Sequence, residues 1–128
     1  MQVNHYEAVP QQPVEMEGSY GCQVRWLLGE PQGAPSFAMR QFEVAPGGYT
    51  PRHSHPYEHE VFVLEGEGEV IEGDQPHRLS PGAVVLVKPD EVHQFRNTGE
   101  APLKFLCLVP HIPEGTPVTM APECGVER

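Results

Sequence analysis

The segment Gly47–Gly66 reads GGYTPRHSHPYEHEVFVLEG and places His53, His55 and His59 within seven residues. His53 and His55 are two residues apart, so in an extended chain their side chains share one face. His59 rejoins that face after a link of three residues. Neutral imidazole is a good ligand for Zn, Cu, Fe and Ni. The segment therefore predicts the first half of a metal site built on β-strands.

The second half is predicted from Gly82–Asn97, GAVVLVKPDEVHQFRN, in which His93 begins a strand candidate. In a barrel, this later strand can lie opposite the first segment. We therefore predict that His53, His55, His59 and His93 together hold one divalent transition metal. The remaining histidines, His5, His77 and His111, occur singly in an arm, a turn and a tail, and we expect them to be exposed.

Turn-forming residues are spread along the whole chain, with 15 prolines and 13 glycines among 128 residues. They separate short apolar runs about every eight to twelve residues, and no segment has a convincing helical period. We predict an all-β protein with about nine or ten antiparallel strands in a sandwich or barrel. The strand candidates are residues 23–28, 37–44, 60–64, 69–72, 77–79, 83–87, 92–96 and 103–109.

The length suits one domain over residues 1–128, with a core barrel at about 22–110. Residues 1–21 are polar and predict an N-terminal arm or edge strand, and the proline-rich residues 111–128 predict a tail that loops over the surface. No internal repeat or shift in composition indicates a second domain.

The composition excludes several classes of protein. With 18 acidic and 8 basic residues, the net charge is -10 and no basic patch for nucleic acid is visible. No apolar run approaches the roughly 18 residues of a membrane span, and the N-terminus lacks the apolar stretch of a signal peptide. The three cysteines are irregularly spaced and predict no disulfide framework, which indicates a reducing, cytoplasmic location.

The two histidine segments resemble the paired motifs of the cupin superfamily. The first motif is Gly, five residues, His-x-His, three or four residues, Glu, six residues, Gly. Gly47 and Gly66 keep its frame around the His53–His55 pair, and His59 stands where the motif has glutamate.

The second motif is Gly, five residues, Pro-x-Gly, two residues, His, three residues, Asn. Gly82, His93 and Asn97 keep this spacing, whereas Pro89 is one place late and Asp90 replaces the second glycine. The matched spacing spans residues 47–97.

This resemblance implies a single-domain double-stranded β-helix, or jelly-roll barrel, that forms a homodimer. Cupins usually bind metal through three histidines and one glutamate. The chain is similar to small cupins with four histidine ligands, in which His-x-His-Pro-aromatic-Glu-His-Glu recurs. Manganese or iron is the expected metal, with zinc, nickel and copper as alternatives.

Glu58 and Glu60 flank His59 and are rival ligands. The motif allows three or four residues between His-x-His and its glutamate, so it would permit Glu60, which four residues separate from His55. The distance to Gly66 favours His59, and strand parity places Glu60 on the opposite face. Either glutamate could instead orient an imidazole or lie in solvent.

Inward-facing residues near the motifs would line a pocket, and Phe42, Phe95 and Cys107 are the candidates. Arg40 and Lys88 are lone basic residues that could contact an anionic substrate. We expect a metal-dependent oxidoreductase of dioxygenase type acting on a small organic substrate. The alternatives are a non-catalytic small-molecule binding or sensing protein, and a metal-dependent isomerase or lyase. The N-terminal strand region and the exposed apolar side chains of one sheet are the expected dimer contacts.

Overall fold

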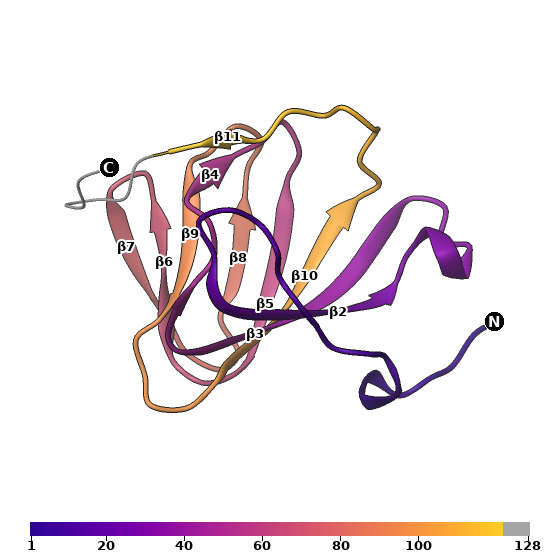
Figure 1. Ribbon diagram of the computed structural model, residues 1–128, viewed down its shortest axis with the longest axis horizontal. Helices are drawn as coiled ribbons and strands as arrows, with labels where there is room; N and C mark the ends of the chain where they lie inside the picture. Colours follow the sequence, from indigo (N-terminus) through magenta and orange to yellow (C-terminus); the bar gives the residue numbers. More distant parts are fainter. Residues whose placement is uncertain (122–128) are drawn as a thin grey trace.

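The computed structural model describes residues 1–121 and shows an antiparallel sheet of eleven strands that curls into a barrel (Figure 1). The prediction of an all-β jelly-roll barrel is confirmed. Two short 3-10 helices, η1 (Tyr6–Ala8) and η2 (Glu30–Gln32), are the only helical turns in this range, and neither is long enough to cross a membrane. The strands are β1 (Gln12–Pro13), β2 (Tyr20–Leu28), β3 (Phe37–Tyr49), β4 (His53–Ser54), β5 (His59–Glu65), β6 (Gly68–Glu72), β7 (Gln75–Leu79), β8 (Val84–Val87), β9 (His93–Asn97), β10 (Leu103–Pro110) and β11 (Thr119–Met120).

Side chains alternate between buried and exposed along the central strands, as expected where one face of a sheet covers a core. In β5, His59, Val61 and Val63 are buried, and the residues between them are exposed. The register places Cys107 of β10 between Arg40 of β3 and Val61 of β5. These rows of inward side chains form the core, which comprises Cys22, Val44, Val61, Val63, Val70, Leu79, Val87, Phe95, Leu103, Phe105 and Cys107.

β3 is longer than the sequence predicts, because it continues through the Pro-Gly-Gly segment that was expected to end it. Gly48 explains why the chain can continue there. A Cβ added at Gly48 would lie 2.6 Å from the carbonyl oxygen of Tyr20, so only glycine allows β2 and β3 to approach so closely. The extension brings Tyr49 beside Tyr20 of β2 and Arg96 of β9, whereas the pairing with β10 uses residues 37–44.

A short strand near each end of the described chain pairs with the barrel. β1 pairs with β2. β11 lies beside β4 (Figure 1), with Met120 paired to His53. The backbone N–H of Ala121 also donates to the carbonyl oxygen of Arg52 at 2.9 Å. Part of the expected surface tail is therefore a strand beside β4. Residues 122–128, including Cys124, lie outside the described part of the chain.

Candidate metal centre

The four predicted histidines begin or follow short strands at one end of the barrel. His53 is the first residue of β4 and lies directly opposite His93, the first residue of β9. His55 follows β4, and His59 is the first residue of β5. All four side chains are buried, with exposed fractions of 9% or less. The structure thus brings together side chains from three strands.

The nitrogen atoms that His53, His55 and His93 offer to a ligand all lie within 4.8 Å of one another. The ring of His59 is adjacent, with its centroid 4.5 Å from that of His55 and 5.5 Å from that of His93. Three rings therefore form a tight group, and the fourth borders it.

Backbone carbonyls fix the orientation of two of these rings. The Nδ1 atoms of His55 and His93 each lie 2.8 Å from a carbonyl oxygen, of Tyr57 and Glu91 respectively. A carbonyl only accepts, so each Nδ1 carries the hydrogen and each Nε2 keeps its lone pair. Histidines that bind metals are usually held in this way. The Tyr57 ring also stacks on His55, with centroids 3.9 Å apart.

His59 has a different partner. Its Nδ1 lies 3.4 Å from Nη2 of Arg40, and a guanidinium only donates. In this arrangement Nδ1 accepts, and the neutral ring carries its hydrogen on Nε2. The rival glutamates lie outside the cluster, since Glu58 and Glu60 are both exposed. Glu60 faces away from the barrel interior, between Leu86 and Leu108.

Burial keeps the imidazoles neutral. Removal from water lowers the pKa of His53 to about 3, that of His59 to about 2 and that of His93 to about 4. The pKa of His55 is lowered for the same reason. At neutral pH the cluster therefore presents unprotonated imidazoles, the form that binds metal ions.

The unpaired polar atoms of the cluster fit a bound metal. Within residues 1–121, three buried side-chain nitrogens lack a hydrogen-bond partner: Nδ1 of His53, Nε2 of His55 and Nε of Arg40. Buried polar atoms without partners are rare and costly, so two such atoms on adjacent imidazoles indicate a missing ligand. The donor set of neutral imidazoles suits a divalent transition metal.

A cavity of about 120 Å³ opens beside the cluster. The sequence-predicted residues Phe42, Phe95 and Cys107 all line it. Phe105 joins them, with ring centroids 5.4 Å from Phe42 and 4.8 Å from Phe95. The remaining lining residues are Val14, Met16, Arg40, Thr50, Pro51, His53, His59 and His93.

Several residues that line the cavity were not assigned to it by the prediction from sequence. Arg40 shares strand parity with Phe42, which is the signal that places it inside the barrel. Val14 and Met16 come from the N-terminal arm, and no local pattern in that polar segment predicts that it covers a cavity. Lys88 is exposed and does not line the cavity.

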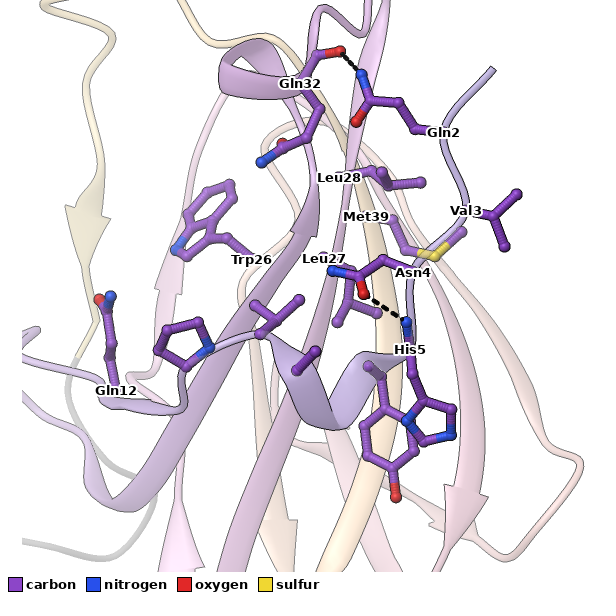
Figure 2. Close-up of a pocket in the computed structure, with 14 residues that line it drawn as sticks. Gln2, Val3, Asn4, His5, Gln12, Trp26, Leu27, Leu28, Gln32 and Met39 are labelled. Carbon is purple, nitrogen blue, oxygen red and sulfur yellow. Dashed lines mark hydrogen bonds between the residues drawn. The ribbon is translucent and has the colours of Figure 1, made fainter.

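A larger cavity of about 620 Å³ lies between the N-terminal arm and β2 (Figure 2). Trp26, Leu28 and Met39 form its apolar wall, and the Gln2 side chain closes one end by donating to the carbonyl oxygen of Gln32 at 2.6 Å. Its one histidine, His5, belongs to no ligand cluster among the described residues. The histidine-lined cavity is therefore the candidate site, although it is smaller.

The other two isolated histidines, His77 and His111, differ in solvent exposure. His77 is exposed, as predicted, and its Nε2 lies 2.8 Å from a carboxylate oxygen of Glu72. The prediction that His111 is exposed is wrong, because its side chain is only 21% exposed and its Nε2 contacts the carbonyl oxygen of Ala34. The tail packs back on the loop before β3, which a local pattern does not show.

Comparison with known proteins finds a matching family model and similar solved structures. Residues 40–109 match the family model of the Cupin domain. Among solved structures, the polyketide cyclase RemF from Streptomyces resistomycificus superposes with a TM-score of 0.88 and 30% identity, covering 98% of this chain and 88% of RemF.

Two curated proteins are similar over shorter regions. Protein SchB of Streptomyces halstedii is 40% identical over 88 residues, which cover 67% of this chain and 64% of SchB. Dimethylsulfoniopropionate lyase DddQ of Ruegeria pomeroyi is 37% identical over 100 residues, which cover 76% of this chain and 49% of DddQ. The chain thus spans less than two thirds of either relative.

Proposed function

The chain belongs to the cupin family, and we propose that it is a metal-dependent cyclase acting on a poly-β-ketone chain. The observation that carries this proposal is the group of buried, neutral histidines at the wall of an aromatic cavity. The choice of substrate rests on the similarity to the polyketide cyclase RemF, which extends over 98% of this chain.

We propose that His53, His55, His59 and His93 hold one divalent transition metal, with manganese or iron first and zinc, nickel or copper as alternatives. The two imidazoles held by backbone carbonyls and the ring of His53 form the core of this set. His59 joins as the fourth ligand when Arg40 no longer donates to it. A bound divalent ion would polarise a substrate carbonyl and make the neighbouring methylene more acidic.

The proposed reaction is an intramolecular aldol condensation. A methylene carbon loses a proton and bonds to a carbonyl carbon of the same chain, and water leaves, so no oxidant is required. The rings of Phe42, Phe95 and Phe105 present apolar faces that exclude water and hold the chain in a folded conformation.

Anaerobic turnover tests this function. The metal-loaded protein is incubated with a linear poly-β-ketone thioester analogue, and the products are followed by mass spectrometry. We expect a product lighter by one water, formed by the wild type and not by the metal-free protein. Spontaneous and enzymatic products formed at the same rate would overturn the proposal.

The dioxygenase-type oxidoreductase is the second candidate, because a set of imidazole ligands also suits iron. It requires oxygen, so oxygen uptake that accompanies turnover, together with no anaerobic product, would favour it over the cyclase. A non-catalytic binding protein would show saturable binding and no product. A metal-dependent isomerase or lyase would convert other small substrates under the same anaerobic conditions.

We also propose a homodimer that forms through the outer face of the sheet. Phe62, Val84 and Leu86 are 46%, 75% and 54% exposed on neighbouring strands β5 and β8. A contiguous apolar surface of this kind is typical of a protein interface. A reducing, cytoplasmic location remains our proposal, and it agrees with the free, buried thiols of Cys22 and Cys107.

A further inference from the structure

We propose that Arg40 forms an anion-binding subsite beside the histidine cluster, which takes an enolate oxygen of a β-dicarbonyl ligand. The presence of the subsite follows from the surroundings of Arg40. The identity of the ligand as a β-dicarbonyl rests on the proposed function.

The position of Arg40 in the sheet directs its side chain to the interior of the barrel. It shares strand parity with Phe42 and Val44 of β3, and the register places it between Trp26 of β2 and Cys107 of β10. Its Nη2 lies 3.1 Å from Sγ of Cys107 and 3.4 Å from Nδ1 of His59. The guanidinium thus lies at the wall of the cavity that the histidines border.

Arg40 lacks a counter-charge. Among residues 1–121, no carboxylate lies within 4.0 Å of its guanidinium, and its buried Nε has no hydrogen-bond partner. Two other cations with shielded side chains are paired with carboxylates: Arg52 with Asp74 at 3.2 Å, and Lys104 with Glu65 at 3.3 Å.

The groups that touch Arg40 do not supply the missing charge. Burial raises the pKa of the Cys107 thiol, so the thiol stays protonated at neutral pH. The neighbouring imidazole of His59 accepts from Arg40 through Nδ1 and supplies no negative charge. A partly desolvated cation without a compensating anion is costly, and an anionic ligand in the cavity would remove that cost.

Two aromatic rings hold the guanidinium in place. Its central carbon lies 5.2 Å from the ring centroid of Trp26 and 4.9 Å from that of Phe42. Such contacts between a cation and aromatic rings restrain the side chain without using its N–H groups. Arginine presents these donors as a planar fork that matches a delocalised oxyanion, which the single ammonium of lysine does not.

An ionised β-dicarbonyl fits this subsite. Its negative charge is shared by oxygen atoms, and a preorganised cation in a site shielded from water stabilises such a charge strongly. Cyclohexane-1,3-dione is a suitable probe because it is a small β-diketone that is largely ionised at neutral pH. Cyclohexanone has the same ring without the charge and serves as the matched control ligand.

The experiment is isothermal titration calorimetry of the metal-loaded protein with each probe. We expect the wild type to bind the dione, Arg40→Met to bind it at least tenfold more weakly, and Arg40→Lys to be intermediate. Arg25→Met is the control variant, because Arg25 donates to the carbonyl oxygen of Val9 in the arm, away from the cavity. Binding of cyclohexanone should not differ between wild type and variants. Elemental analysis and circular dichroism check that each variant keeps its metal and its fold.

Equal dione affinity in the wild type and Arg40→Met, or no dione binding by the wild type, would overturn the subsite. If Arg40→Met does not fold, Arg40→Lys serves in its place, because it keeps the charge but loses the planar set of guanidinium donors. Wild-type dione affinity in Arg40→Lys would then overturn the subsite. The cyclase proposal can fail while the subsite stands. If dione binding depends on Arg40 but the protein shows no anaerobic turnover, the result supports the subsite and contradicts the cyclase. A measurement on the metal-free protein gives a second readout, in which the dependence on Arg40 should persist.

Discussion

His53 and His93 face each other across the β4–β9 ladder, with ring centroids 4.8 Å apart. The two residues belong to different sequence motifs, and the pairing of two short strands brings them together. Their proximity makes the candidate metal site dependent on barrel closure, because neither segment alone presents both rings.

Replacing His93 should remove the metal. We expect His93→Ala, purified without added metal, to retain less metal than the wild type, because even losing a group that only orients a ligand weakens metal affinity by about 10–100-fold. His77→Ala is the matched control, since His77 is exposed on β7. Elemental analysis of both proteins measures the result, and equal metal contents would contradict the assignment of His93.

Replacing His59 tests the fourth ligand. We expect His59→Ala to lower the metal content, whereas Glu60→Gln should leave it unchanged because Glu60 is exposed on the outer face. Competition with a metal chelator gives the affinity of each variant. Undiminished affinity in His59→Ala would reduce the site to the three histidines whose nitrogens lie within 4.8 Å of one another.

The buried histidines predict that the metal-free protein is sensitive to acid. Their pKa values in the folded state lie below the ordinary value of 6.5, at about 3 for His53 and about 4 for His93. Their neutral forms stabilise the fold above pH 6.5, and this contribution is lost as the pH falls toward the folded-state values, since the unfolded chain binds protons first.

The expected loss is about 1.4 kcal/mol per histidine for each pH unit well below 6.5. Thermal unfolding of the metal-free protein between neutral pH and about pH 5 should show a falling Tm. A Tm that stays constant over that range would contradict this account of the cluster.

Gly48 should be intolerant of a side chain. A Cβ there would lie 2.6 Å from a backbone oxygen, so we expect Gly48→Ala to destabilise the protein by about 1–3 kcal/mol through overpacking. At Gly29 the nearest atom to an added Cβ is 3.6 Å away, which makes Gly29→Ala the control. Urea unfolding gives both free energies, and equal values would refute the role of Gly48.

The proposed dimer can be tested on its apolar face. Leu86→Lys places a charge on the exposed surface of β8, where Val84 is also exposed, and should convert a dimer to a monomer. Arg78→Ala, on the exposed strand β7, should leave the assembly unchanged. Sedimentation velocity at micromolar concentration distinguishes the two states, and a monomeric wild type would rule out the dimer.

The sequence alone determined the all-β fold class and which face of a strand each side chain takes. Turn residues at short intervals predicted an all-β barrel, and a period of two predicted that His59 and Glu60 point to opposite faces, as the structure has them. These predictions succeed because side-chain direction in a strand depends only on local backbone geometry. A barrel allowed the two histidine segments to lie opposite each other, and their resemblance to cupin motifs supported the expectation that they meet.

Only the tertiary structure decided what lies next to the cluster. The pairing of β11 with β4, the cover provided by Met16 of the arm, and the partial burial of His111 all join segments that are distant in sequence. Local periodicity says which face a residue takes, but the closure of the barrel decides what it faces. Arg40 illustrates the difference: parity places it inside, while its contacts with His59 and Cys107, and its lack of a carboxylate partner among residues 1–121, follow from the packing of three strands around one cavity.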